Sequence, residues 1–307
     1  MSITLETFRK SLTYSVTAAV SDIVKDLREL ATLDRVSEAK QAEFGSLATK
    51  CVIGAITSVV IAFILMIVVG EMGDGFQLLG NASIVLLLFV GVGCTIVAIY
   101  AGIRRSKYSR LNLPNHRYAL TEKLLGMLER DMDKDANISV HLVLSPSNQK
   151  SKLIKTVSHS LKSGFKIDIF QDDWLKIEGN FLDKTRFVLT TSELNQTAYG
   201  WKTSRSGKSK YKTKSKAKGL DISLDLTYPQ RRYGAIKVLN NEAVNAVKIP
   251  KLTKVKRMRV TDKGINLVVK MSPSMPWDQE TLYQTITMMF LSVYQVLNLA
   301  RMLSKAK

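Results

Sequence analysis

The sequence predicts an α+β membrane protein: a two-helix transmembrane hairpin plus a cytoplasmic antiparallel β domain with N-terminal and C-terminal amphipathic helices. Two observations lead to this class. Two uncharged, apolar stretches of about 20 residues lie close together in the first third of the chain. From residue 138 to residue 271, segments rich in β-branched or alternating residues are separated by turn sequences.

The transmembrane hairpin is assigned to residues 51–103. Its two apolar stretches, 51–70 and 82–103, contain no charged residue, and each is long enough to cross a hydrocarbon core of about 30 Å. The short connection carries acids but no lysine or arginine, whereas Arg104 and Arg105 directly follow the second stretch. Because positive residues concentrate on the cytoplasmic side of a membrane, we expect an integral membrane protein with both termini and the main domain in the cytoplasm.

The segment before the first stretch, residues 1–50, is expected to be a cytoplasmic amphipathic helical segment. Apolar residues recur every three or four positions from Leu5 to Leu30, which predicts one helix over residues 3–33. Acidic and basic residues are mixed on its polar side, whereas helices that lie on membranes favour basic polar faces. We therefore expect this helix to pack on the domain or to support a homo-oligomer.

Charge separates the rest of the chain from the membrane segment. The net charge of +19 comes entirely from residues 104–307, where 38 Lys and Arg face 17 Asp and Glu; residues 1–103 hold 7 against 9. Residues 104–307 are therefore expected to form a basic cytoplasmic α+β domain whose partners are anionic. The last 30 residues predict a helix that covers the sheet, with a third membrane-associated helix as the alternative.

A lysine ladder from Gly207 to Gly219 is the most unusual local pattern. Lysine occupies every second position, and a period of two matches a strand, in which alternate side chains point to one face. In a helix the same lysines would spread around the axis. The ladder consists of Lys208, Lys210, Lys212, Lys214, Lys216 and Lys218.

We expect the ladder to be the second half of a β-hairpin at about residues 185–227. A two-residue turn at Ser206–Gly207 pairs apolar residues at the base of the hairpin and sets lysines beside aromatic residues on the same face of its tip. Gly200 and Gly219 are the expected bend points. The alternative is a flexible loop that becomes ordered only on a partner. The expected pairs are Arg205–Lys208, Trp201–Lys212, Tyr199–Lys214, Leu189–Leu224 and Phe187–Leu226.

The candidate anion-binding site combines this tip with two further basic groups. Its aromatic members suit the interfacial zone of a membrane, and they also suit stacking on nucleobases. The complete set is the six ladder lysines with Arg205, Trp201, Tyr199, Arg231, Arg232, Lys254, Lys256, Arg257 and Arg259.

No pattern in the sequence predicts catalysis, a cofactor or a metal. The three histidines are scattered, Cys51 and Cys94 have no metal-ligand spacing, and the acids at 131–135 lack the glycine and glutamate of a calcium loop. The leading hypothesis is a non-enzymatic, two-pass membrane protein whose basic domain engages an anionic phospholipid bilayer or an acidic protein partner, as a scaffold or assembly component. The alternatives are a membrane-anchored nucleic-acid-binding protein and a subunit of an oligomeric channel.

Overall fold

The computed structural model describes residues 8, 11–71, 74–109, 113–133, 135–204, 206–234, 247–251, 253–273 and 279–305. The chain forms two compact units. Residues 1–29 and 114–307 make up the first, called here the sheet domain. Residues 30–113 make up the second, called the helical unit.

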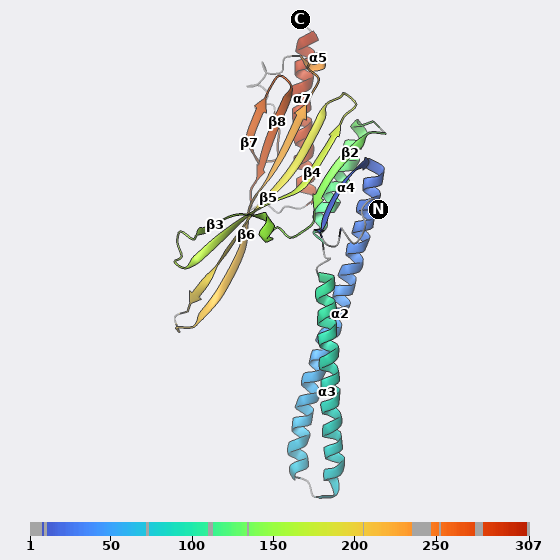
Figure 1. Cartoon of the computed structure of the whole chain (residues 1–307), viewed down its shortest axis with the longest axis vertical. Coiled ribbons are helices and arrows are strands. Elements are labelled where there is room, and N and C mark those ends of the chain that lie inside the picture. The colour runs from blue at the N-terminus through green and yellow to red at the C-terminus, as the bar shows by residue number, and fades with distance from the viewer. Residues whose placement is uncertain are drawn as a thin grey trace. The chain divides into compact units, whose positions relative to one another are not determined.

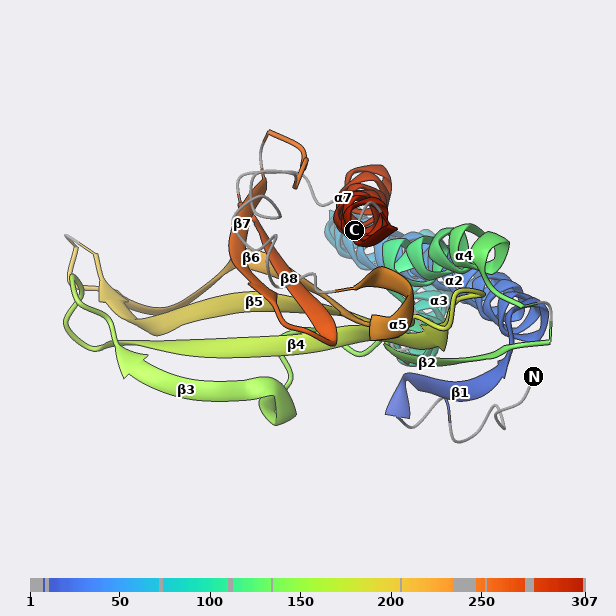
Figure 2. The ribbon, with the colours of Figure 1, turned by 90° about the horizontal axis from the view of Figure 1, so that it is seen from above.

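The sheet domain is built on an antiparallel sheet that has eight strands within the described residues (Figures 1 and 2). The strand order is β1-β2-β4-β5-β6-β8-β7, and β3 pairs with β4 beside this path. This confirms the predicted mixture of helices with an antiparallel sheet. The strands are β1 (Thr13–Ala19), β2 (Asn137–Val143), β3 (Leu153–Ser158), β4 (Phe165–Asn180), β5 (Arg186–Thr203), β6 (Ser209–Thr227), β7 (Thr253–Val260) and β8 (Gly264–Met271).

Two helices, α4 (Asn115–Leu128) and α7 (Gln279–Lys305), lie on one face of this sheet (Figure 2). Their apolar residues meet the inward-facing residues of the strands; the rings of Phe187 on β5 and Phe290 on α7 are 5.9 Å apart. Most apolar residues of α7 are needed for this core. The short elements are η1 (Glu129–Asp131), η2 (Lys150–Lys152) and α5 (Gln230–Tyr233).

The N-terminal segment differs from the single helix predicted over residues 3–33. Phe8 and Ser11 are helical, but Thr13–Ala19 form β1, which pairs with β2 along its whole length, and the long helix α2 begins at Val20. The apolar spacing favours a helix here, but backbone pairing with β2 stabilises a strand over Thr13–Ala19 instead. Tyr14 on β1 is fully buried, and its hydroxyl donates a hydrogen bond to the Asp26 carboxylate 3.1 Å away on the helix.

The helical unit consists of most of α2 (Val20–Glu71) and of α3 (Asp74–Ser109), which pack antiparallel. The rings of Phe44 and Tyr108 stack with centroids 5.8 Å apart, and a Cβ on Gly91 would lie 2.7 Å from the hydroxyl of Ser58. Gly91 therefore lets the two backbones approach closely.

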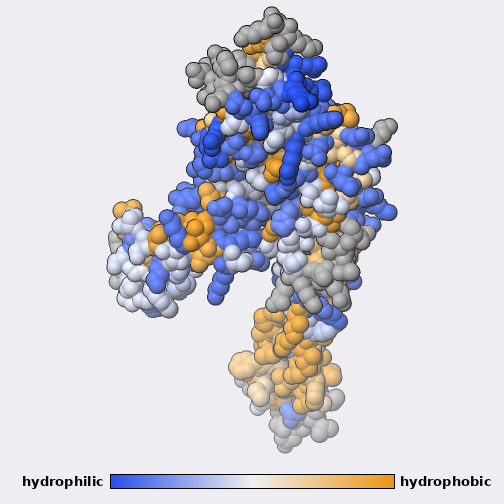
Figure 3. Space-filling view, turned by 45° about the horizontal axis from the view of Figure 1, so that its top comes forward, coloured by the Kyte–Doolittle hydropathy of each residue, from blue (hydrophilic) through white to orange (hydrophobic). Residues whose placement is uncertain are grey.

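The surface of these paired helices is largely apolar, as the lower part of Figure 3 shows. Within the described residues, three helices are long and apolar enough to cross a membrane: α2, α3 and α7. The apolar window is 17% buried in α2 and 11% in α3, but 44% in α7, whose apolar residues serve the sheet core. The exposure of α2 and α3 is what a surrounding bilayer would cover, and the chain has the character of a membrane protein.

The contact at Gly91 gives a direct test of helix packing. Gly91→Ile should destabilise the helix pair by about 1–3 kcal/mol, because the new side chain overlaps Ser58. Gly93→Ile is the matched control, since a Cβ there meets nothing within 4 Å. Loss of helicity during titration with SDS would measure the difference. Equal stability of the two variants would contradict the close approach at Gly91.

Three strands extend beyond the part of the sheet that the helices cover. Strands β4, β5 and β6 have 16, 18 and 19 residues, whereas strands in globular proteins usually have about 3–10. Their outer parts (residues 165–171, 195–203 and 209–217) join β3 to form a four-stranded projection, called here the arm (Figures 1 and 2). The hairpin predicted at residues 185–227 corresponds to the paired strands β5 and β6, whose outer parts belong to the arm.

A buried ion cluster lies where the covered sheet ends and the arm begins. The Arg117 guanidinium of α4 lies 2.8 Å from Asp172 on β4 and 2.9 Å from Glu193 on β5, which face each other across the two strands. Lys152 lies 2.8 Å from Asp172 on its other side, so the cluster holds two charges of each sign. Burial lowers the pKa of the Lys152 ammonium, and its hydrogen bond to Asp172 opposes that effect. Arg117 also donates to the Val143 carbonyl, 2.9 Å away.

Removing the guanidinium should destabilise the sheet domain strongly. Arg117→Met leaves the Asp172 and Glu193 carboxylates with Lys152 as the remaining cation of the cluster. Removing one partner of a buried ion pair costs about 3–5 kcal/mol. The same substitution in an Asp172→Asn, Glu193→Gln background should cost clearly less. Chemical unfolding of the full chain in detergent, with hydrogen exchange of β4 and β5, measures both costs. An equal cost in both backgrounds would show that Arg117 acts by packing alone.

Candidate anion-binding site

The turn at the tip of the β5–β6 hairpin is longer than the two residues predicted at Ser206–Gly207. The amide of Ser204 donates to the carbonyl of Lys208 at 2.9 Å, and the amide of Gly207 donates to the carbonyl of Ser204 at 3.0 Å. Gly207 has φ +79°, a left-handed conformation that a glycine adopts without strain. Arg205, predicted as a site residue, lies outside the described residues.

This turn imposes a register on the tip that differs from the predicted one by one residue. At the base, Phe187 pairs with Leu226 and Leu189 with Leu224, as predicted from their apolar character. At the tip, Trp201 pairs with Tyr211. Tyr199 likewise pairs with Thr213, so the predicted partners Lys212 and Lys214 are wrong for both aromatic residues.

A β-bulge at Lys218 reconciles the two registers. Leu194 pairs with Gly219 and Asn195 with Ala217, which leaves Lys218 as one extra residue on β6. Gly219 has φ +151°, and a Cβ there would lie 3.1 Å from the Lys270 side chain, so the bulge needs a glycine at this position. The predicted bend at Gly219 is this bulge.

The bulge moves the lysines to the other face of the sheet. Strand β5 alternates without interruption, and its odd-numbered residues continue the face that is buried at the base. Those residues now pair with the odd-numbered residues of β6, so the ladder lysines project from the opposite face. The prediction that lysines continue the face of Leu220–Leu226 is wrong. This face of the arm is called here the lysine face; its β6 members are Lys210, Lys212, Lys214 and Lys216.

The aromatic residues lie mainly on the other face of the arm. There the rings of Trp201 and Tyr211 are 5.5 Å apart, and the Tyr199 hydroxyl donates to Asp168 at 3.2 Å. Partial desolvation and the Asp168 carboxylate raise the pKa of Tyr199, so this phenol stays neutral. By register, Trp201 and Tyr199 therefore belong to the face opposite the ladder lysines, and the prediction that they share one face is wrong.

The lysine face encloses a shallow hollow of about 850 Å³ between the β5–β6 edge and the β3–β4 turn. Six lysines line it, and none of the described residues around it carries a carboxylate. Trp201 also borders it at the tip. The lining residues are His159, Lys162, Ser163, Phe165, Gln196, Ala198, Trp201, Lys202, Thr203, Lys212, Thr213, Lys214, Lys216 and Lys218.

The β3–β4 hairpin contributes residues that the sequence prediction missed. The Phe165 ring lies over Gly200, where a Cβ would come within 2.8 Å of it, and the Lys162 ammonium lies 5.5 Å from the ring centre. Gly200, predicted as a bend point, instead makes room for this ring. Leu161 in the same turn is 88% exposed. A signal existed in the sequence HSLKSGFK, which places basic and apolar residues around a turn.

An apolar row crosses the middle of the lysine face. The register aligns Val157, Ile167, Ala198 and Lys214 on neighbouring strands. The lysines thus form one border of a partly apolar surface. Among the described strands, none pairs with the outer edge of β6 at residues 209–217, because β8 pairs only with residues 220–227. Lysines on an exposed edge discourage pairing with other chains.

The other predicted basic residues divide into two groups. By register, Lys254, Arg257 and Arg259 on β7 point to the same side of the sheet as the lysine face. Lys256 is the extra residue of a second bulge, and its ammonium pairs with Asp221 at 2.5 Å. Arg231 and Arg232 lie in α5, beyond the opposite end of β6 and roughly 35 Å along the strand from the ladder. They are not part of one site with the ladder.

No protein family, curated protein or solved structure matches this chain. Among the described surfaces, the basic hollow of the arm concentrates the most lysines without a carboxylate. It can hold an anion or an anionic surface.

The register of the arm can be tested by disulfide formation. With Cys51 and Cys94 replaced by alanine, Thr197→Cys and Ser215→Cys should form a disulfide rapidly, because the two native hydroxyls are 3.0 Å apart. Thr197→Cys with Lys216→Cys is the pair that the unbulged register favours, and it should react slowly. Mobility on non-reducing gels measures both rates. Faster reaction of the second pair would contradict the bulge at Lys218.

Proposed function

We propose that this chain is a non-enzymatic, two-pass membrane protein whose arm binds the anionic phospholipid surface of a bilayer. In this proposal α2 and α3 cross the membrane as a hairpin, and the sheet domain and both termini lie in the cytoplasm. The lysine face binds lipid headgroups, and the protein acts as a membrane-associated scaffold or assembly component.

The single observation that carries the proposal is the hollow of the lysine face. Six lysines line this hollow, and none of the described lining residues carries a carboxylate. The ladder lysines of β6 have exposed side chains. Each lysine near an anionic bilayer contributes about 1 kcal/mol, so the four strand lysines of the ladder could together supply a few kcal/mol. Salt would weaken this attraction, because the Debye length is about 8 Å at physiological ionic strength.

Exposed apolar side chains at the tip of the arm favour a lipid surface over other anions. Trp201 is 65% exposed and lines the basic hollow. Leu161 is 88% exposed and precedes Lys162, which also lines it. Tryptophan is enriched at membrane interfaces, where an apolar ring can enter the headgroup zone while nearby cations remain hydrated. A free phosphate would use the lysines but would leave these side chains exposed.

The proposed topology follows from the sequence around α2 and α3. Arg104, Arg105 and Lys107 follow the apolar part of α3, and the connection between the helices contains acids and no Lys or Arg. Because the sheet domain belongs to the same chain, a bilayer that holds the helices is always at high effective concentration for the arm. Acidic proteins and nucleic acids would have to bind from solution.

Vesicle binding tests the proposal with the full chain. Held in neutral nanodiscs, the protein should bind added vesicles in proportion to their phosphatidylserine content, and binding should weaken as salt rises. Replacing Lys210, Lys212, Lys214 and Lys216 with glutamine should reduce partitioning at least about tenfold, given about 1 kcal/mol for each lysine. Flotation measures the bound fraction. The full chain is required, because a fragment starting at residue 104 would lack β1.

A charge-matched control separates the lysine face from net charge. Arg130, Lys184, Arg231 and Lys263 lie in η1, in turns or in α5, at the other end of the sheet, and their replacement by glutamine removes the same four charges. This variant should bind nearly as well as the wild type. Equal loss in both variants, or binding that ignores lipid charge, would contradict the proposal. Displacement of the vesicles by equimolar RNA would favour the nucleic-acid alternative instead.

A further inference from the structure

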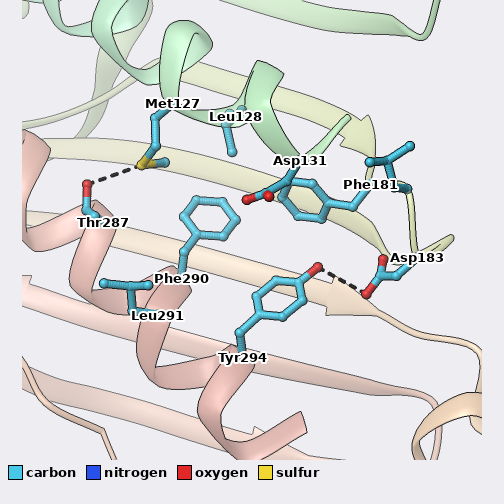
Figure 4. A pocket seen from close by; sticks show the side chains of 10 residues that line it. Met127, Leu128, Asp131, Phe181, Asp183, Thr287, Phe290, Leu291 and Tyr294 are labelled. Atoms are coloured by element: carbon cyan, nitrogen blue, oxygen red, sulfur yellow. Dashed lines mark hydrogen bonds between the residues drawn. The ribbon is translucent and has the colours of Figure 1, made fainter. Parts of the chain in front are cut away.

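A second concave site lies within the sheet domain, on the helix-covered side of the sheet and apart from the arm. It is a cavity of about 370 Å³ between α4 and η1, the β4–β5 turn, and α7 (Figure 4). Its volume falls in the range of about 300–1,000 Å³ that is typical of small-ligand sites. The lining residues are Met127, Leu128, Asp131, Phe181, Leu182, Asp183, Thr287, Phe290, Leu291 and Tyr294.

Three aromatic rings form the wall of this cavity. The ring of Phe181 meets those of Phe290 and Tyr294 edge-to-face, with centroids 6.0 and 5.7 Å apart. Phe181 and Phe290 are buried, whereas Leu182 and Leu291 at the rim are 64% and 60% exposed. The cavity therefore has an apolar interior that opens to solvent between exposed leucines. Its size fits one small molecule with an aromatic or branched apolar body.

Two carboxylates belong to the same cavity. Asp183 accepts hydrogen bonds from the hydroxyls of Tyr233 and Tyr294 and from the amide of Thr185, which is 2.8 Å away. Burial alone would raise the pKa of Asp183, but the hydrogen bonds from Tyr233 and Thr185, with Arg232 nearby, lower it below the ordinary value. The Asp183 carboxylate thus remains ionised at neutral pH, although its oxygens are largely engaged.

Asp131 supplies the second negative charge from the other side of the opening. Its backbone carbonyl accepts a hydrogen bond from the Leu182 amide at 2.9 Å, which joins η1 to the β4–β5 turn. Figure 4 shows its carboxylate turned toward the cavity beside the Phe181 and Phe290 rings. Within the described residues, no lysine or arginine lines the cavity, so a cationic group could reach this carboxylate.

Aromatic rings with adjoining carboxylates are the chemistry that recognises organic ammonium ions. A cation over the face of an aromatic ring gains about 0.5–1 kcal/mol when exposed and about 2 kcal/mol or more when it is desolvated. A neutral apolar molecule would fill the cavity but would form no ion pair with the exposed Asp131 carboxylate, whereas an ammonium group could. We infer that this cavity binds a small organic ammonium ion with an apolar body. This inference does not depend on the function proposed for the arm.

Calorimetry with the full chain in a maltoside detergent tests the inference, with benzyltrimethylammonium as the probe. The wild type should bind the cation, and benzyl alcohol, which is aromatic and neutral, should bind more weakly. Asp131→Asn keeps the shape of the side chain and removes its charge, so it should weaken cation binding by about fivefold or more, equivalent to about 1 kcal/mol. The affinity for benzyl alcohol should not change in this variant.

Asp133→Asn is the matched control, because Asp133 is an exposed acid two residues away that does not line the cavity. It should leave cation binding unchanged. Leu291→Arg, at the exposed rim, should abolish cation binding without unfolding the domain, and thermal unfolding would verify its stability. Absence of cation binding at millimolar probe, equal binding of the neutral probe, or equal effects of Asp131→Asn and Asp133→Asn would overturn the inference.

A lipid headgroup and a free amine could both supply such a cation. Phosphocholine should compete with benzyltrimethylammonium if the site accepts choline headgroups. Failure of phosphocholine to compete, with benzyltrimethylammonium still bound, would assign the site to free amines that carry an apolar body. Both results keep the ammonium site, and they identify the source of its ligand.

Discussion

The ion cluster around Arg117 is the interaction on which the architecture of the sheet domain depends. It joins α4 to β4 and β5 where the helices cease to cover the sheet, and its four charges balance among Arg117, Lys152, Asp172 and Glu193. A bulge at Trp174 adjoins Asp172 on β4, and the Trp174 ring lies 5.1 Å from the guanidinium. Inside this boundary the helices cover an apolar face of the strands; beyond it the strands carry the ladder lysines together with exposed apolar and aromatic side chains. The cluster therefore fixes where the core ends and the arm begins.

The arm shows how two local rules can conflict within one hairpin. Apolar pairing sets the register at the base, whereas hydrogen bonding between Ser204 and Lys208 sets the register at the tip. The two differ by one residue, and the bulge at Lys218 absorbs the difference where Gly219 can adopt a positive φ. The bulge therefore decides which face of the arm carries the lysines, and the proposed lipid-binding surface depends on it.

The sequence was sufficient for features whose cause is local. The apolar runs predicted the long helices, the β-branched segments predicted an antiparallel sheet, and the pairs at Phe187 and Leu189 follow from alternation. Strand β1 was missed because its pairing partner lies more than 100 residues away. The bulge depends on the length of a turn, which composition does not specify. The Arg117 cluster and the cavity at Phe181 assemble residues from distant segments, so no spacing in the sequence could reveal them.

In the proposed function, the tip of the arm enters the headgroup region of an anionic bilayer. With Cys51 and Cys94 replaced by alanine, a spin label on Leu161→Cys reports its depth in bilayers that hold the full chain, through collision with oxygen and with a water-soluble nickel complex. Adding phosphatidylserine should raise oxygen access and lower nickel access at residue 161. A label on Lys263→Cys, in the β7–β8 turn, should not respond. A label at residue 161 that stays equally accessible to nickel in neutral and anionic bilayers would contradict the claim.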